Sequence, residues 1–169
     1  MKNIHVLNTD KLSRLFSILQ FNYVFDKDNN YSEVYKKVHG YKNQHVFITS
    51  DEEIKEGDIF IHPNGTIERA SRSLDGRGIS KIILTTDQDL IADGVQSISN
   101  DFLEWFVDNP NCMMVEVEEI KCTGQCWKFI ESDYEDTCLS GCELKGEYKI
   151  IIPKEELKQE TIEIKIKSK

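Results

Sequence analysis

Residues 58–70, DIFIHPNGTIERA, carry the clearest local signal for structure in the chain. This stretch holds two short runs rich in β-branched and aromatic residues, one on each side of Asn64-Gly65. An Asn-Gly pair between two such runs is a strong local signal for a β-hairpin, because a type I′ turn needs a positive φ at both central residues. We therefore predict a hairpin over residues 58–70 that turns at Asn64-Gly65.

Short β runs continue in both directions from this hairpin. Residues 45–49 (HVFIT) precede it, and KIILTT, residues 81–86, follows a loop of sequence SRSLDGRG. A nearly unbroken run of β-branched and aliphatic residues is typical of a strand that is buried on both faces. We therefore expect 81–86 to be a central strand. Four further segments show β patterns, at residues 4–7, 113–118, 148–152 and 161–166.

Two segments show the spacing of an amphipathic helix. After the capping side chains of Asn8-Thr9-Asp10 in the sequence, apolar residues follow the pattern i, i+3, i+4, i+7. This pattern predicts a helix over about 10–20. They are Leu12, Leu15, Phe16 and Leu19. A second helix is predicted behind Ser99, with Phe102, Leu103 and Phe106 on its apolar face and Asn109-Pro110 at its end. Residues 21–44 read as variable and partly loop, with one short helical face made by Tyr31, Val34, Tyr35 and Val38.

These elements predict one α+β domain over residues 1–169, with a Cys-bearing insertion at about 119–147. A chain of 169 residues suits a single core. We expect a mostly antiparallel, partly barrel-like sheet with two or three short helices. The predicted core residues are Ile82, Leu84, Phe102, Phe106, Val115 and Val117.

The net charge of −9 is concentrated in the middle of the chain. Residues 1–50 carry +3, residues 51–121 carry −10 and residues 122–169 carry −2. Such acidity disfavours binding nucleic acid through its phosphates and suits docking onto a basic surface. The predicted partner-binding residues are Asp51, Glu52, Glu53, Asp87 and Asp89. The alternative is that these residues are solvated loop and cap positions.

Four of the five cysteines form two pairs with the same spacing. Cys122 and Cys126 are separated by three residues, as are Cys138 and Cys142. Four thiolates can close a tetrahedral zinc site, so one structural zinc ion is the predicted cofactor. Structural zinc sites more often have two residues between paired ligands, which leaves free buried thiols and disulfides as alternatives. The fifth, Cys112, is expected to be an ordinary core or surface thiol.

No catalytic constellation stands out, and we expect a protein that is not an enzyme. The four histidines (His5, His39, His45 and His62) are scattered, and the glycine-containing Asp75–Gly78 is not followed by a helix that could hold a phosphate. No apolar run reaches the roughly 18–20 residues of a membrane span, and the N-terminus lacks the pattern of a signal peptide. The expected location is the cytoplasm, without a membrane partner.

Four segments together resemble a set of small uncharacterised proteins carried by phages and integrated elements of Bacteroidetes-type bacteria. The segments are Met1–Leu15, Val46–Asp58, Lys81–Glu118 and Tyr148–Glu160. They cover roughly half of the chain, whereas residues 21–44 and 119–147 depart from the shared pattern. The resemblance implies no biochemical activity and no functional residue. Variable segments on a constant scaffold are a common place for partner choice.

Small acidic phage proteins commonly bind and inhibit a host protein or protein complex. The resemblance and the acidity together lead us to expect an anti-defence inhibitor, similar to anti-CRISPR proteins. It would bind a host nuclease or its RNA-loaded complex stoichiometrically. The alternative is a nucleic-acid-associated accessory factor in phage replication or transcription, for which residues 1–50 offer the only basic face with aromatic side chains.

Overall fold

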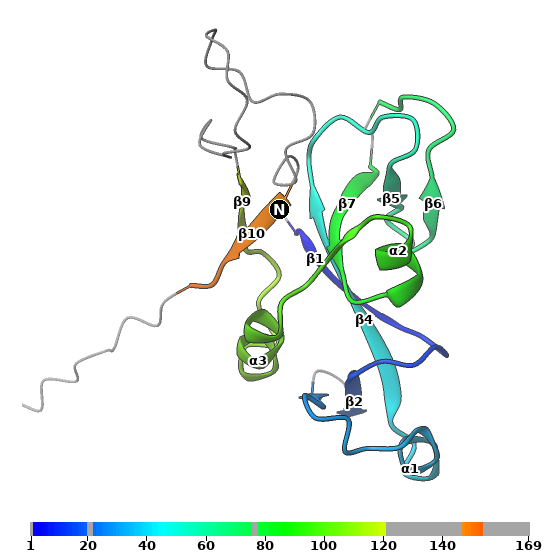
Figure 1. The fold of residues 1–169 in the computed structure, drawn as a ribbon, viewed down its shortest axis with the longest axis vertical. Helices are drawn as coiled ribbons and strands as arrows, with labels where there is room; N and C mark the ends of the chain where they lie inside the picture. The colour runs from blue at the N-terminus through cyan, green and yellow to red at the C-terminus, as the bar shows by residue number, and fades with distance from the viewer. Residues whose placement is uncertain (1, 20–21, 76–77, 121–146, 154–169) are drawn as a thin grey trace, which may run out of the picture.

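The computed structural model describes residues 2–19, 22–75, 78–120 and 147–153. Over these residues it contains three helices: α1 (Glu33–Val38), α2 (Gln88–Ala92) and α3 (Asn100–Asp108) (Figure 1). The strands are β1 (Ile4–Asn8), β2 (Leu15–Leu19), β3 (Asn22–Phe25), β4 (Lys42–Ser50), β5 (Ile59–Ile61), β6 (Ile67–Arg69), β7 (Ser80–Thr85), β8 (Gln96–Ser97), β9 (Glu116–Ile120) and β10 (Glu147–Ile151). All strand pairs are antiparallel except β7 with β8. The predicted α+β class with short helices is confirmed.

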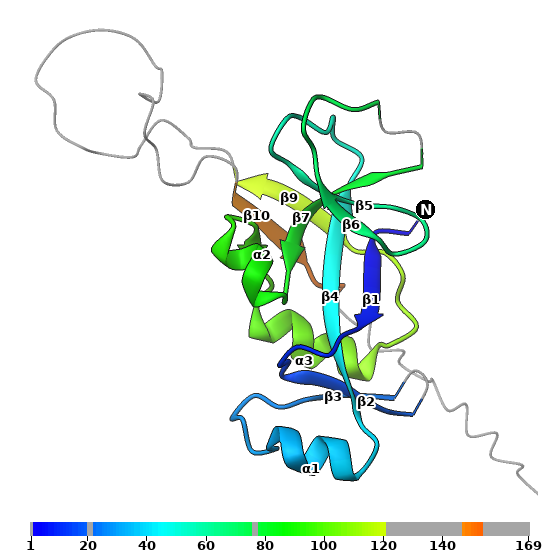
Figure 2. The same cartoon turned by 90° about the vertical axis from the view of Figure 1, so that its right-hand side faces the viewer.

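The nine-residue strand β4 is the spine of the main sheet. β1 pairs with its residues 44–48 along one edge. β2 and β7 share the other edge, where β2 pairs with residues 42–44 and β7 with residues 47–50. The sheet path runs β3-β2-β4-β7-β5-β6 and stays open instead of closing into a barrel (Figure 2).

β7 is the buried central strand that its sequence predicts. Ile82, Ile83, Leu84 and Thr85 are all buried. A register shift opposes Leu84 to Ile48 but Ile82 to Thr49, so Ile83 is the extra residue of a β-bulge. Ile83 and Leu84 consequently both join the main core, whereas Ile82 packs on a separate cluster with Phe47 and Ile59. The prediction that Ile82 shares one core with Leu84 is therefore wrong.

The predicted hairpin is present as β5 and β6, with Ile61 opposite Ile67. Its turn is not type I′, because Gly65 has a φ of 87° but Asn64 does not have a positive φ. The turn instead runs from His62 to Gly65, whose N–H donates to the His62 carbonyl at 2.9 Å. Pro63 takes the second position of this turn, where proline favours the ordinary type I geometry and leaves the left-handed position to glycine.

The helix predicted over about 10–20 is wrong, because residues 15–19 form β2. Leu15 is buried in the main core, and the adjacent Phe16 is buried on the opposite face against the rings of Tyr31 and Tyr41. Leu12 and Leu19 remain 71% and 70% exposed. Leu15 and Phe16 are therefore adjacent apolar residues because β2 is covered on both faces where it begins. Their spacing matches a helix only by coincidence. Thr9 caps a local turn, and its Oγ1 accepts from the Lys11 N–H at 3.1 Å.

The main core lies between the sheet and α3, with the β9–β10 ribbon beside them (Figure 1). Ser99 caps α3 as predicted, its Oγ accepting from the Phe102 N–H at 3.3 Å. Phe102, Phe106 and Val115 are buried in this core, and Val117 packs against it, which confirms their predicted association with Leu84. The predicted strand over 113–118 begins only at Glu116, and the one over 161–166 lies outside the described residues.

Two histidines, buried His45 and half-buried His5, are expected to make the fold sensitive to mild acid. Burial lowers the pKa of both His45 and His5 below the ordinary value of 6.5. The unfolded chain therefore takes up protons at a higher pH than the folded chain does. The stabilisation is complete above about pH 6.5 and is lost as the pH falls below it. Melting temperatures measured from about pH 8 to 5 should fall over this range, and His45→Gln should flatten the decline.

The carboxylates titrate in a separate range and serve as an internal control. Burial raises the pKa of Asp87 and Glu33, but their hydrogen bonds lower it overall below the ordinary 3.8 and 4.5. Their contribution to stability is present above those values and is lost only at more acid pH. A melting temperature that stays constant until the pH reaches about 4.5 would contradict the role given to the histidines.

Candidate functional site

A groove of about 830 Å³ runs beside β9, where the chain passes the end of β4 and the segment before β1. Its carboxylates come from two distant parts of the sequence: Asp51 and Glu52 follow β4, and three more lie on β9. Those three are Glu116, Glu118 and Glu119. Lys2 is the one cation among the described residues of the lining. We call this lining the acidic groove; five carboxylates against one ammonium give it a negative potential.

The acidic groove has apolar material at its base. Ile83 and Val115 belong to the main core, and Val117 packs against that core. Met114 also lines the groove and is exposed, as is the preceding Met113. Methionine side chains adapt their shape to a partner, so this base suits apolar anchors from another protein. Apolar contacts of this kind hold a complex, and surrounding charges orient it.

Hydrogen bonds from the Asn3 side chain and from backbone N–H groups fix the two walls of the acidic groove relative to each other. The Asn3 side chain donates to the Val115 carbonyl at 2.7 Å and accepts from the Val115 N–H at 2.9 Å. The N–H groups of Asn3 and Ile4 both donate to the Met113 carbonyl, at 3.0 and 3.1 Å. These bonds join the start of β1 to the segment before β9. The groove is thus held in shape before any partner binds.

Glu52 is anchored by a contact from the β9–β10 ribbon. The Tyr148 hydroxyl of β10 donates to the Glu52 carboxylate, at 3.1 and 3.0 Å from its two oxygens. Burial, and secondarily Glu52, raises the pKa of the Tyr148 hydroxyl well above its ordinary value, so it stays a donor. Lys81 Nζ lies 3.6 Å from Glu52 and 3.3 Å from Asp58. Glu52 is therefore partly neutralised, whereas Asp51 and the three β9 glutamates form no ion pair with another described residue.

The structure separates the predicted partner-binding residues into two groups. β4 and β7 are antiparallel, so the residues after β4 and the residues after β7 lie at opposite ends of the sheet. Val46, which bonds to Thr86, and Asp51 are five residue steps apart along β4; at about 3.3 Å per step this spans roughly 17 Å. Asp51 and Glu52 line the acidic groove, and exposed Glu53 follows them. Asp87 and Asp89 belong to another surface.

Asp87 has a structural role at the start of α2. It is the helix N-cap, is only 7% exposed, and accepts from the Asp89 N–H at 3.0 Å. Lys11 Nζ lies 3.2 Å from Asp87 and 2.7 Å from Asp89. The cap interpretation therefore fits Asp87, and its carboxylate is not free to meet a partner.

Sequence reasoning missed Glu116, Glu118 and Glu119. Their alternating pattern predicts a strand with one wet face, which is a general property of surface strands. Nothing local to this pattern indicates that β9 lies next to the end of β4. The available signal was the high proportion of acid over residues 51–121.

The predicted zinc ligands Cys122, Cys126, Cys138 and Cys142 lie outside the described residues. The insertion that carries them leaves from the β9–β10 ribbon, whose last paired residues are Ile120 and Glu147. Within the described ranges, no group of three or more His, Cys, Asp or Glu side chains is placed to hold a metal ion. Cys112 is a free, half-buried thiol, and its Sγ lies 3.1 Å from the Met114 carbonyl.

Zinc binding by the four insertion cysteines stays a prediction with a direct test. Purified protein should carry about one equivalent of zinc by elemental analysis. Chelation should then lower protection from hydrogen exchange around 119–147 while the main sheet keeps its melting transition. Metal-free protein with the same melting temperature would support the thiol alternative, and loss of free thiols without metal would indicate disulfides.

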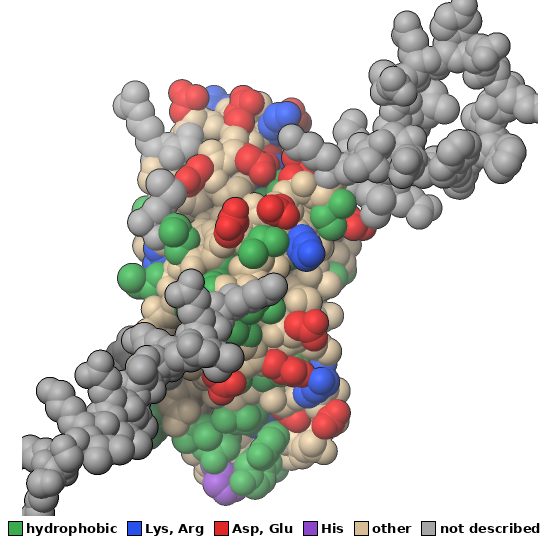
Figure 3. Space-filling view, turned by 90° about the vertical axis from the view of Figure 1, so that its left-hand side faces the viewer, with side chains coloured by type: hydrophobic (Ala, Val, Ile, Leu, Met, Phe, Trp, Pro, Cys, Tyr) green, Lys and Arg blue, Asp and Glu red, His purple; other side chains and the backbone are tan. Residues whose placement is uncertain are grey.

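The basic aromatic face expected near the N-terminus is largely occupied by internal contacts. Lys27 pairs with Glu104 at 2.6 Å, and buried Lys36 pairs with Glu33 at 2.8 Å. The tyrosines stack among themselves and on His39, with Tyr35 and His39 ring centroids 4.0 Å apart. Apolar side chains gather at the α1 end of the molecule (Figure 3), including exposed Val34 and Val38. On the face that Figure 3 draws, this end is therefore more apolar than basic.

No family model matches the chain, and no curated protein or solved structure matches it. Among the described helices, none has both the length and the apolar character needed to cross a membrane.

Proposed function

We propose that this protein is a stoichiometric inhibitor that docks through the acidic groove onto a basic surface of a host defence protein or ribonucleoprotein, with a CRISPR effector as the first target to test. The observation that carries the proposal is the convergence of Asp51 and Glu52 with three β9 glutamates around an apolar base. The phage-type resemblance of the sequence supports the choice of target.

The groove favours protein binding because charge and apolar surface meet in one place. Opposite potentials speed the encounter of two proteins and fix their orientation, while buried apolar anchors slow dissociation. A nuclease surface that holds RNA or DNA is rich in Lys and Arg. Carboxylates held in place by the rest of the fold can occupy such a surface in place of phosphates.

The accessory-factor alternative has weaker support from the described residues. Three of the cations that would contact phosphates are already in ion pairs: Lys11, Lys27 and Lys36. Each would have to exchange a carboxylate for a phosphate. Arg14, Lys37 and Lys42 form no ion pair among the described residues and stay available to phosphates. Binding to a single-stranded oligonucleotide, measured by fluorescence anisotropy at low and physiological salt, provides the comparison.

The decisive experiment is a titration of inhibition. A purified, RNA-loaded CRISPR nuclease of the host is held at a concentration well above the dissociation constant, and DNA cleavage is measured as the inhibitor is added. We expect residual activity to fall linearly to an endpoint near one inhibitor per nuclease. Complete inactivation by a small fraction of one equivalent would contradict stoichiometric binding and indicate an enzyme.

A further inference from the structure

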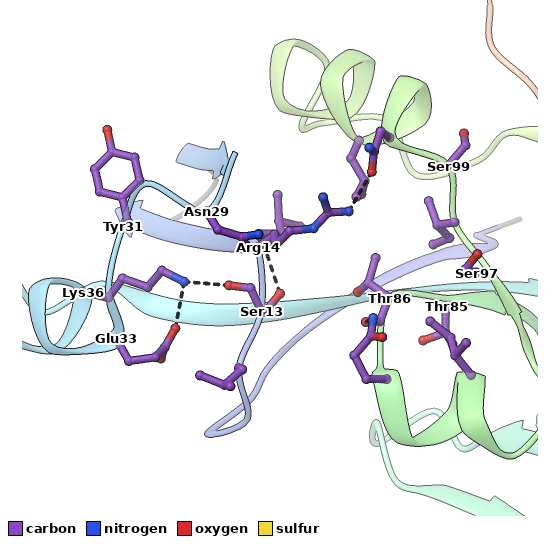
Figure 4. A pocket seen from close by; sticks show the side chains of 17 residues that line it. Ser13, Arg14, Asn29, Tyr31, Glu33, Lys36, Thr85, Thr86, Ser97 and Ser99 are labelled. Carbon is purple, nitrogen blue, oxygen red and sulfur yellow. Dashed lines mark hydrogen bonds and ion pairs between the residues drawn. The ribbon is translucent and has the colours of Figure 1, made fainter. Parts of the chain in front are cut away.

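A second concave site lies where the main sheet is interrupted, and its lining shares no residue with that of the acidic groove. β2 pairs with β4 only up to Gln44, and β7 begins its pairing at Phe47. Two hydroxyls satisfy the β4 backbone nearby: Ser13 Oγ donates to the Gln44 carbonyl at 2.6 Å, and Thr86 Oγ1 accepts from the Val46 N–H at 2.9 Å. A pocket of about 770 Å³ opens at this interruption (Figure 4).

Hydroxyl groups recur in the lining of this pocket. Six of its lining residues carry one: Ser13, Tyr31, Thr85, Thr86, Ser97 and Ser99. Asn29, Gln88 and Asn100 add side-chain amides, and leucine and isoleucine side chains supply apolar surface. Its volume falls in the range of small-molecule sites, which combine apolar walls with a few placed polar groups. Four of these hydroxyls already bond within the fold: those of Ser13, Thr85, Thr86 and Ser99. Among the described residues, the Tyr31 and Ser97 hydroxyls make no such bond, so these two, with the side-chain amides, are the groups offered to a hydroxylated ligand.

Among the described residues, the charged groups in the pocket leave one cation without an acidic partner. Buried Lys36 donates to Glu33 at 2.8 Å and to the Ser13 carbonyl at 2.7 Å, so Lys36 and Glu33 balance each other. Arg14 is half-buried and donates to the Asn100 side-chain oxygen at 2.7 Å (Figure 4). Within the described ranges, no carboxylate forms an ion pair with the Arg14 guanidinium.

Arg14 is also fixed in position by its surroundings. Its guanidinium lies 5.1 Å from the centre of the Phe25 ring and is 3.4 Å from the Lys27 carbonyl. A guanidinium has five N–H donors, and the contacts to Asn100 and Lys27 use two of them. The remaining donors match the planar, two-point hydrogen bonding that phosphate oxygens accept.

We propose that this pocket binds a phosphomonoester on a hydroxylated carbon skeleton, with the phosphate on Arg14 and the skeleton against the hydroxyl-bearing walls. Two sources share this chemistry: a sugar phosphate and a nucleoside monophosphate. The ring of Tyr31 lies at the pocket and is 40% exposed, so a nucleobase has an aromatic face to stack on. The overall charge of −9 repels anions, so anion binding here would require a specific site.

The test uses isothermal titration calorimetry with four probes on the full chain: ribose 5-phosphate, AMP, adenosine and inorganic phosphate. We expect saturable one-site binding of ribose 5-phosphate and AMP, and much weaker binding of adenosine and inorganic phosphate. Equal affinity for the first two assigns a sugar phosphate. Tighter binding of AMP, with the difference lost in Tyr31→Leu, assigns a nucleotide.

Variants connect the binding to this pocket. Arg14→Gln should weaken the phosphorylated probes at least tenfold, whereas Lys42→Gln, which removes a cation outside the pocket lining, should leave the affinity unchanged. Ser97→Leu keeps Arg14 and fills space at an exposed position of the lining, so it tests the site even where Arg14→Gln fails to fold.

Three results would overturn the proposal. The first is no binding of either phosphorylated probe at millimolar concentration. The second is adenosine or inorganic phosphate binding as tightly as AMP. The third is an equal loss of affinity in Lys42→Gln and Arg14→Gln, which would indicate a diffuse electrostatic effect.

Discussion

Phe106→Ala is expected to lower the free energy of unfolding by about 3–5 kcal/mol, a large fraction of the total for a domain of this size. Phe106 is 1% exposed and lies on the buried face of α3. Its ring centroid is 5.9 Å from that of Phe102 and 5.6 Å from that of Tyr23 on β3. The substitution leaves a cavity at the point where α3 joins the sheet. Urea denaturation followed by circular dichroism measures the change.

Val38→Ala is the matched control for that measurement. Val38 is apolar but 75% exposed on α1, so its truncation should change the free energy of unfolding by less than about 0.5 kcal/mol. Ile83→Ala provides a second core position, at the bulge of β7, with an expected loss of about 2–4 kcal/mol. Equal stability of Phe106→Ala and the native chain would refute the packing of α3 against the sheet.

Sequence reasoning succeeded where one segment carries its own signal. The hydrophobic run of β7, the hairpin of β5 and β6, and the cap of α3 at Ser99 are decided by residues close together in the chain. Each signal has a local physical cause: burial on both faces, a turn with a glycine at a left-handed position, and a side chain that satisfies a free N–H group. None of these three predictions depends on where distant parts of the chain lie.

Sequence reasoning failed where a distant segment decides the outcome. Leu15 and Phe16 match a helical pattern, but the main core covers Leu15 on one face of β2. Phe16 is covered on the other face by Tyr31, by Tyr41 and by Lys36 of α1, so both neighbours are buried in a strand. Ile82 and Leu84 alternate in sequence, but the bulge at Ile83 against β4 places them on different clusters. The acidic groove depends on the docking of β9 beside the end of β4, which has no local signal.

The fold shows which acidic residues are ion-paired and at which end of the sheet each group lies. Asp87 and Asp89 are drawn to Lys11 at one end of the sheet, whereas Asp51 and Glu116 lie at the acidic groove without an ion pair among the described residues. Total charge alone therefore overstates the number of carboxylates available to a partner. The acidic groove collects five carboxylates from residues 51–121, the segment that carries most of the negative charge in the sequence.

Reversing the groove charges should strongly slow association with the target nuclease. The double variant Asp51→Lys, Glu116→Lys changes two exposed carboxylates that line the acidic groove. Electrostatic steering accelerates protein association by about 10–1,000-fold, so we expect an association rate at least tenfold lower at low salt. The melting temperature should change little, because neither residue is buried. Stopped-flow or surface plasmon resonance measures the rate.

The control separates the groove from the overall charge. Asp28→Lys, Asp108→Lys makes the same change in net charge at two exposed positions outside the groove. Its effect on the association rate should be much smaller, and Asp89→Lys, at the other end of the sheet, should resemble this control. Raising the salt to physiological strength shortens the screening length to about 8 Å and should reduce the difference between the two double variants. If both double variants slowed association equally, the partner would respond to net charge alone, and the acidic groove would lose its role as the docking surface.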